Sequence, residues 1–375
     1  MSINKKSLIA SQAKEILVII AYFLSVFGLI MILDISSVNF AAKGGNPYLI
    51  FLKQMLWLFI ASVIFFILLE TEIKTIRRII PVVMPVSILL LVILLIPAIT
   101  PAVKGARRWI FLTKSVMVQP VEFVKIIWIL YLADYLDRHR KELDDFKILI
   151  GPMIILAVLT LLVFSQPDFG STVTLILLFL VVFFLAHVPI SRLIVLVLAG
   201  IPLIYWAVFG SPYRKDRITA FLAPFKHGSA EGYQLTRSLI AVASGGIFGK
   251  GAGSSTSRLM YLPCAHTDFI FSVICEEFGF IGSLFVLFLF SVFVIIGFKM
   301  AVKCRDNFSR IAIGSLTALI AISALANIAV STGLLPTKGM ALPFMSYGGS
   351  NLLATFIAVG LIITIYMESA ERMLG

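Results

Sequence analysis

The chain has 375 residues, of which 60% are hydrophobic and only 13% are charged, and its formal net charge is +12. Soluble domains carry about 25% charged residues, so this composition, with a mean hydropathy of +1.05, excludes a soluble globular protein. We therefore predict an all-α polytopic membrane protein that forms one integral domain over residues 1–375.

Ten apolar stretches are long enough to cross a bilayer, since a spanning helix needs roughly 20 apolar residues. The even number places both ends of the chain on the same side. We expect no cleavable signal peptide, because the first stretch is too long for a signal core. The predicted spans are residues 15–34, 49–69, 79–99, 119–137, 148–165, 172–188, 192–209, 268–298, 311–332 and 349–367.

The distribution of Lys and Arg predicts the orientation of these spans. Positive charges occur in almost every short loop on the side of the termini, whereas those on the other side concentrate in loops 100–118 and 210–267. Because long loops determine topology weakly, we expect cytoplasmic termini and a large structured extracytoplasmic loop at 210–267. The two basic outer loops would either serve the function or bind lipid headgroups.

The first polar cluster is the sequence GARRWIFLTKSVMVQPVEFVKIIW. Its guanidinium groups, Arg107 and Arg108, suit phosphate oxygens. Trp109 either stacks on a sugar or belongs to the aromatic belt at the membrane interface. Glu122 and Lys125 share one helical face inside a span. They form either an ion pair that locks helix packing or the polar wall of a substrate cavity.

Asp168, in the motif SQPDFGST, precedes an apolar run and is therefore expected to cap a helix. Its carboxylate could also line a cavity between spans. In the long outer loop, Leu235, Leu239 and Val242 form a stripe typical of an interfacial amphipathic helix. The glycine-rich stretch that follows is not a phosphate loop, because Lys250 is followed by glycine instead of Ser or Thr. We therefore expect a flexible hinge there and no nucleotide cofactor.

A polar triplet, His266, Thr267 and Asp268, opens the eighth and longest span. A carboxylate at a membrane boundary is energetically costly, so Asp268 is a candidate functional residue. Two adjacent acids, Glu276 and Glu277, lie farther along the same span and must face a partner or a cavity.

Between the last two spans, the sequence LLPTKGMALPFMSYGGSNLL breaks the helical pattern with prolines and glycines. Irregular backbone at membrane depth is tolerated only where protein covers it or where it lines a polar cavity. We expect Lys338, Ser346 and Ser350 to line such a cavity. The three cysteines fall in an outer loop, a helix and an inner loop, so they predict no disulfide or metal framework.

These motifs, in this order and over about residues 15–370, resemble the shape, elongation, division and sporulation (SEDS) family, the FtsW/RodA-type peptidoglycan polymerases. Ala265, the stretch GYQLTRSLIAVASGG and the segment TKG resemble the FtsW, cell-division branch more than RodA. The sequence departs from the family pattern at Val121, Arg237 and Cys264.

The resemblance implies a ten-span enzyme with an outward-facing cavity in the cytoplasmic membrane. Such an enzyme polymerises lipid II, a disaccharide-peptide on undecaprenyl pyrophosphate, into glycan strands for the division septum. It works with a class B penicillin-binding transpeptidase and other division proteins, and with no nucleic acid. The family's catalytic aspartate matches Asp268, its functional tryptophan matches Trp109, and its polar cavity residues match Glu122, Lys125 and Asp168.

Two roles are open for Asp268: a general base for the attacking sugar hydroxyl, or a ligand of a divalent cation such as Mg²⁺ or Mn²⁺. Positive charge on the leaving pyrophosphate would come from Arg107, Arg108 and Lys338. His266, Thr267 and Ser346 complete the expected substrate-binding set. The alternative functions are a lipid II transporter (flippase), a non-catalytic division scaffold, and a RodA-type elongation polymerase.

Overall fold

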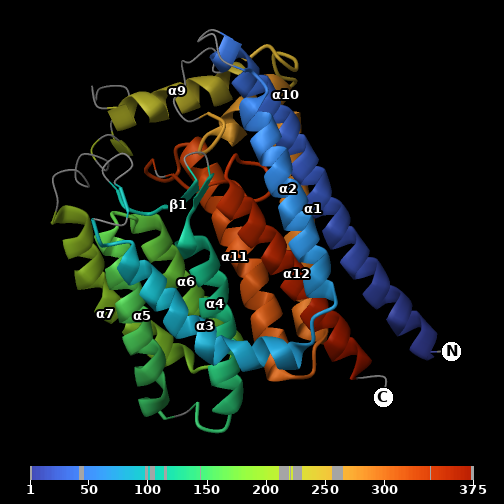
Figure 1. Ribbon diagram of the computed structural model, residues 1–375, viewed down its shortest axis with the longest axis vertical. Coiled ribbons are helices and arrows are strands. Elements are labelled where there is room, and N and C mark those ends of the chain that lie inside the picture. Colours follow the sequence, from blue (N-terminus) through green and yellow to red (C-terminus); the bar gives the residue numbers. More distant parts are fainter. Residues whose placement is uncertain are drawn as a thin grey trace.

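The computed structural model describes residues 2–41, 46–97, 100–101, 106–113, 116–143, 145–210, 219, 221–222, 230–255, 265–337 and 339–372. It is a bundle of long helices that run between two ends (Figure 1). The helices are α1 (Ser2–Ala41), α2 (Leu49–Leu69), α3 (Ile73–Ile93), α4 (Pro120–Arg138), α5 (Lys147–Ser165), α6 (Phe169–Leu185), α7 (Ile190–Phe209), α9 (Ala230–Ser244), α10 (Ile270–Lys303), α11 (Asn307–Ser331) and α12 (Gly349–Glu371).

Each of the ten predicted spans overlaps one of these helices, and the predicted amphipathic helix overlaps α9. Within the described residues, seven helices are each long and apolar enough to cross a membrane: α1, α2, α3, α5, α10, α11 and α12. The apolar helix α6 is shorter, and α4 carries several charged residues. The fold is therefore that of a multi-pass membrane protein.

The two termini lie at the same end of the bundle, which we call the terminal end (Figure 1). The opposite end, the loop end, carries α9 and a small hairpin. The hairpin pairs β1 (Ile110–Thr113) with β2 (Val116–Val118) in antiparallel fashion, with Ile110 opposite Val118. The all-α prediction did not anticipate these strands, although β-branched and aromatic residues favour them.

The predicted start of the third span was wrong by several residues, because α3 begins at Ile73 instead of residue 79. Arg77 belonged to a loop in the prediction. In the structure its guanidinium pairs with Asp134 at 2.6 Å and with Asp137 at 2.9 Å, both on α4. Partnered charges can lie within a helix next to the bilayer, so the helix extends past the boundary that hydropathy indicated.

The helices α11 and α12 form the centre of the bundle. In the most apolar stretch of α11, 72% of the residues are buried, and in that of α12 the fraction is 78%. The corresponding fraction in α2 is 17%. They pack against each other, and both also pack against α4 and α10. The segment that joins them, residues 332–348, therefore begins and ends at the centre of the loop end.

The long helix α10 is broken near its start. Gly279 has φ +66° and ψ −160°, which separates an N-terminal segment (residues 270–278) from the long remainder. Only glycine adopts this backbone conformation without strain. The sequence predicted one long span over residues 268–298. The structure instead has a separate short helical segment, against which α9 packs.

Candidate active site

Asp268 lies in the turn of residues 265–268 that leads into α10, and the residue is partly exposed. Its main-chain carbonyl accepts a hydrogen bond of 2.8 Å from Asn327 Nδ2 on α11. The same nitrogen donates to the carbonyl of Met340 at 2.6 Å. Asn327 is 1% exposed, so one buried amide joins the Asp268 turn to the connecting loop, which we define as residues 339–348.

A glycine leaves space for the Asp268 carboxylate. A Cβ atom added at Gly339 would lie 3.1 Å from Asp268 Oδ2. Few real Cβ atoms approach another atom so closely, so a side chain at position 339 would displace either the carboxylate or the loop. The connecting loop therefore forms one wall beside Asp268.

The connecting loop is held to the turn at a second point. The amide of Tyr347 donates to the carbonyl of His266 at 2.9 Å, and the two rings lie 5.7 Å apart. Burial raises the pKa of the Tyr347 phenol, so this side chain stays neutral at physiological pH. Thr267, between His266 and Asp268, is partly exposed. The polar triplet of the sequence thus lies on one turn against the connecting loop.

The loop is also fixed from α2 by Gln54, whose side chain is 1% exposed. Gln54 Nε2 donates to the carbonyl of Ser346, and Gln54 Oε1 accepts from the amide of Gly348, both at 3.2 Å. The Ser346 hydroxyl accepts from the amide of Leu342 at 2.8 Å and is 1% exposed. Ser346 therefore stabilises the loop itself, and its role as a substrate ligand stays a prediction.

Aromatic packing anchors the base of the connecting loop. Phe344 has φ +67°, which is unusual for a residue with a side chain. Its buried ring packs against Phe293 and Phe356, with ring centroids 5.7 and 6.0 Å apart. Packing against α10 and α12 holds this backbone conformation.

Asp168 caps helix α6, as the sequence predicted. Its carboxylate accepts hydrogen bonds from the amide and the hydroxyl of Ser171, at 3.1 and 2.9 Å, and from Gln119 Nε2 at 3.3 Å. The amide of Gln119 in turn donates to the hydroxyl of Ser350 at 2.8 Å. Asp168 and the start of α12 are therefore joined through Gln119.

The two arginines of the first cluster differ. Arg108 donates to the carbonyl of Gln166 at 3.0 Å and also to the carbonyl of Pro167, so it fixes the turn before Asp168. The Nε atom of Arg107 is buried and has no hydrogen-bond partner among the described residues. Arg107 is therefore the better candidate for an anionic ligand. Trp109 follows them and is partly buried.

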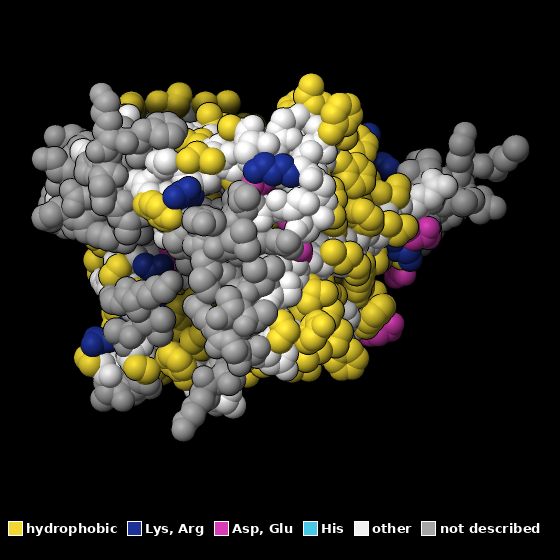
Figure 2. Space-filling model, turned by 90° about the horizontal axis from the view of Figure 1, so that it is seen from above, with side chains coloured by type: hydrophobic (Ala, Val, Ile, Leu, Met, Phe, Trp, Pro, Cys, Tyr) yellow, Lys and Arg dark blue, Asp and Glu magenta, His cyan; other side chains and the backbone are white. Residues whose placement is uncertain are grey.

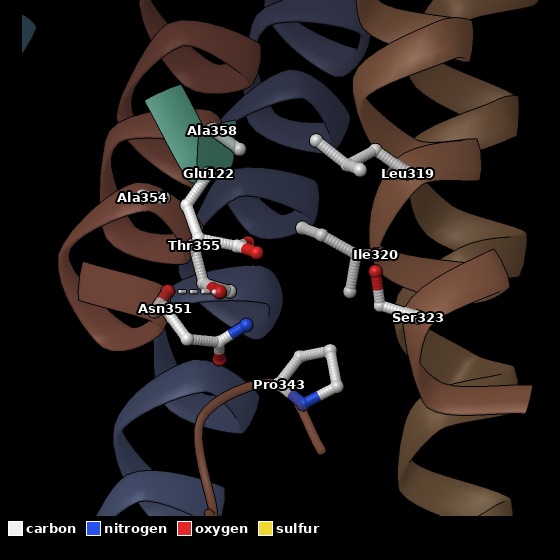
Figure 3. A pocket seen from close by; sticks show the side chains of 9 residues that line it. All are labelled: Glu122, Leu319, Ile320, Ser323, Pro343, Asn351, Ala354, Thr355 and Ala358. Atoms are coloured by element: carbon white, nitrogen blue, oxygen red, sulfur yellow. Dashed lines mark hydrogen bonds between the residues drawn. The ribbon is translucent and has the colours of Figure 1, made fainter. Parts of the chain in front are cut away.

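Glu122 and Lys125 form the ion pair that their spacing predicted. Lys125 Nζ lies 2.8 Å from both carboxylate oxygens of Glu122. The side chain of Lys125 is 6% exposed and that of Glu122 is 15% exposed. Glu122 also lines a pocket between α4, α11 and α12, beside Ser323, Asn351 and Thr355 (Figure 3). Both interpretations of the sequence therefore describe part of the geometry: the pair is formed, and its acid faces a pocket.

The connecting loop and the start of α12 thus join the separate polar clusters of the sequence. They contact the Asp268 turn, the Gln119–Asp168 cluster and, through Pro343 and Asn351, the Glu122 pocket. Basic side chains stand on this face of the molecule when it is viewed from the loop end (Figure 2). Lys338 and Cys264 lie outside the described residues.

Two of the three departures from the family pattern have a structural setting. Val121 is buried at the start of α4, and Arg237 lies over the ring of Tyr233, 5.1 Å from its centroid, on α9. The stripe of α9 packs on protein, with Leu235 buried and Leu239 close to Gly333.

The sequence matches the family model described as "Cell cycle protein", which groups FtsW, RodA and SpoVE, over residues 14–371. The chain belongs to this family. It is 37% identical over 374 residues to a probable peptidoglycan glycosyltransferase FtsW of Coxiella burnetii, covering 98% of this chain and 99% of that protein. The FtsW of Trichlorobacter lovleyi, with the same description, is 37% identical over 97% of this chain and 96% of its own length.

Solved structures of the family share the fold. One of them is a chain in a solved structure described as "Structural coordination of polymerization and crosslinking by a peptidoglycan synthase complex". It superposes on this chain with a TM-score of 0.79 at 25% identity, covering 94% of this chain and 97% of its own length. The rod shape determining protein RodA of Thermus thermophilus superposes with a TM-score of 0.69 at 24% identity, covering 94% and 96%.

Proposed function

We propose that this protein is a peptidoglycan glycosyltransferase of the FtsW type, which polymerises lipid II into glycan strands at the outer face of the cytoplasmic membrane. The observation that carries the proposal is the setting of Asp268. Its main chain is fixed by Asn327, the residue is partly exposed, and its carboxylate lies beside Gly339. A pre-positioned carboxylate that substrate can reach is what general base catalysis requires.

In the proposed reaction, a sugar hydroxyl of one substrate attacks the anomeric carbon of the other. The new bond joins that oxygen to the carbon, the bond from the carbon to the pyrophosphate oxygen breaks, and undecaprenyl pyrophosphate leaves. Asp268 accepts the hydroxyl proton. Arg107, whose Nε atom is buried without a described partner, stabilises the negative charge that develops on the pyrophosphate.

A divalent cation such as Mg²⁺ or Mn²⁺ fits this site only together with substrate. No group of three or more His, Cys, Asp or Glu side chains suited to a metal exists in the part of the chain that the structure describes. Mg²⁺ is commonly held by one or two carboxylates plus substrate phosphates. Asp268 would supply the carboxylate, and the bound ion would neutralise phosphate charge.

The proposed setting is septal wall synthesis, with a class B penicillin-binding transpeptidase and other division proteins as partners and with the terminal end in the cytoplasm. A structural neighbour from a peptidoglycan synthase complex supports the pairing with a transpeptidase. The spread of Lys and Arg over short loops at the terminal end supports the orientation. In this orientation the Asp268 turn and the connecting loop face the extracytoplasmic side.

The test is polymerisation of labelled lipid II, resolved on a gel, by the purified protein with its transpeptidase partner. We expect long glycans from the wild type and a loss of about 100-fold or more for Asp268→Asn. Asp137→Asn is the matched control, because it makes the same change at the terminal end, and it should retain polymerisation. Equal products from wild type and Asp268→Asn would contradict the proposal, as would transport of lipid II in vesicles without glycan formation.

A further inference from the structure

Glu276 is fully buried in the N-terminal segment of α10, two turns after Asp268. Its Oε1 atom accepts a hydrogen bond from Lys250 Nζ at 2.7 Å, and its Oε2 atom accepts one from Ser255 Oγ at 2.5 Å. The expectation that an acid inside this span needs a partner is confirmed for Glu276. The reaction proposed above uses none of these three residues.

Lys250 belongs to a glycine loop, which we define as residues 245–251, and this loop fills the break in α10. A broken helix leaves carbonyls on one side and amides on the other without helical partners. The amides of Lys250 and Gly251 donate to the carbonyls of Glu276 and Glu277, both at 3.0 Å. The amides of Phe280 and Ile281 donate to carbonyls of the glycine loop at 2.9 and 3.2 Å.

Glycines allow this close contact between two backbones. A Cβ atom at Gly249 would lie 2.1 Å from the carbonyl oxygen of Glu277, and one at Gly245 would lie 1.9 Å from that of Cys275. The expectation of a flexible hinge in this stretch was therefore wrong. The glycines permit the loop to dock against α10, and the Lys250–Glu276 ion pair fixes the docked loop.

The other end of the same segment carries Asp268. Asn327 holds the carbonyl of Asp268, and the hydroxyl of Ser272 lies 2.6 Å from that of Ser238 on α9. Ser238 also donates to the carbonyl of Ser331 at 2.7 Å. The segment 270–278 is thus fixed along its length, with Asp268 before one end and Glu276 near the other.

We propose that Glu276, through its bonds to Lys250 and Ser255, is a positioning residue that sets the place of Asp268 against the connecting loop. The inference rests on the proposed function, because it assumes that Asp268 acts on lipid II. Glu276 joins Ser255 to the helix that directly follows Asp268. Loss of this tie lets Asp268 move, while the surfaces that bind lipid II stay intact.

The first test is Glu276→Gln, with kcat and KM for lipid II polymerisation measured separately. The change removes the charge and keeps the shape. Because misplacement of a catalytic group by about 1 Å can cost about 100-fold in rate, we expect kcat to fall by about tenfold to 100-fold and KM to change by less than about twofold. Asp134→Asn is the control, since it breaks a similar ion pair at the terminal end, and its kcat per folded molecule should equal that of the wild type.

The second test compares two glycines and does not depend on the charge of Glu276. Gly249→Ala and Gly246→Ala both place a side chain at positive φ, +80° and +56°. Only the first meets the α10 backbone, because nothing lies within 4 Å of a Cβ at Gly246. We expect Gly249→Ala to lower kcat like Glu276→Gln, and Gly246→Ala to retain it.

The outcomes separate the two proposals. If the wild type polymerises lipid II and both Glu276→Gln and Gly249→Ala retain wild-type kcat per folded molecule, the positioning role is wrong and the proposed function stands. If these variants raise KM as much as they lower kcat, the ion pair supports substrate binding and the positioning role is again wrong. If wild type and Asp268→Asn both fail to form glycans, the proposed function is wrong, and the inference fails with it.

Discussion

The terminal end and the loop end of the bundle both gather charged side chains, but they use them differently. At the terminal end, Asp134 pairs with Arg77 and Arg138 at 2.6 and 2.8 Å, and the guanidinium of Arg77 also lies over the ring of Phe308. The charged side chains there join α3, α4 and α11 to one another. At the loop end, Asp268 is partly exposed, and its main-chain carbonyl accepts the hydrogen bond from Asn327.

This contrast separates charges that hold helices together from charges that can act on a ligand. An acid whose oxygens are occupied by Arg side chains is committed to structure, whatever its place in the sequence. Asp268 instead is partly exposed and has its main chain fixed by Asn327, so a ligand can reach this residue. The Glu122–Lys125 pair combines both arrangements, because its ions are paired and its acid faces a pocket.

The largest effect on stability is expected for Lys125→Met. Removing one partner of a mostly buried pair leaves the Glu122 carboxylate without its cation, which costs about 3 kcal/mol in the free energy of unfolding. The double variant Lys125→Met with Glu122→Gln should recover most of this loss. Unfolding by denaturant in micelles measures both.

Polymerisation by that double variant then decides what the pair does. Normal activity would place Glu122 and Lys125 with the structural pairs of the terminal end. Loss of activity at recovered stability would show that Glu122 serves the substrate cavity. Wild-type stability of the single variant Lys125→Met would contradict a structural role for the pair.

A smaller effect, about 2 kcal/mol, is expected for Asn327→Leu. This change keeps the volume and leaves the carbonyls of Asp268 and Met340 without their hydrogen-bond donor. We expect kcat to fall by about tenfold, because the turn and the connecting loop separate. Thr317→Val, on the same helix, is the control, since the Thr317 hydroxyl donates to the carbonyl of Ile313 within α11. Full activity of Asn327→Leu would mean that the amide does not position Asp268.

The smallest effect concerns Asp306, the N-cap of α11 at the terminal end. Burial by itself raises the pKa of this carboxyl, but hydrogen bonds from Ser309 and Ser369 outweigh it and lower the pKa below the usual 3.8. A lowered pKa in the folded state gives stability that is present above the unfolded value and is lost as the pH falls through the folded value.

Asp306→Asn should therefore be less stable than the wild type at pH 7, by up to about 1 kcal/mol, because Asn also caps helices well. The difference should vanish as the pH falls below the folded pKa of Asp306. Thermal unfolding from pH 7 to pH 3 measures it. A difference that stays constant over this range would show that the Asp306 carboxylate does not contribute through its charge.

Hydropathy and local spacing predicted the helices, the cap at Asp168 and the ion pair of Glu122 with Lys125, because these features depend on residues close together in the sequence. The contacts that build the site depend on distant residues. Gln54 meets the carbonyl of Ser346, 292 positions away, and Asn327 lies 59 positions from Asp268. A single Asn or Gln inside an apolar span was the available signal, but it does not reveal the partner.

The break at Gly279 was missed for a different reason. The stretch around it is continuously apolar, so hydropathy favours one uninterrupted helix. The break is stabilised by backbone hydrogen bonds to the glycine loop, and backbone groups have no signature in composition. The positive φ of Gly279 and the glycines of the loop have one common explanation, which is the close contact between the glycine loop and α10. That contact is visible only in the structure.

The position of the connecting loop in the chain has a consequence for biosynthesis. This loop lies just before the last helix, and it carries the contacts with the Asp268 turn and with Gln119. Chains are made and inserted from the N-terminus, so the site cannot assemble until α12 has left the ribosome and entered the membrane. A prematurely terminated chain would hold Asp268 and most of the bundle, yet it would lack the wall beside the carboxylate. We therefore expect only completed chains to be active.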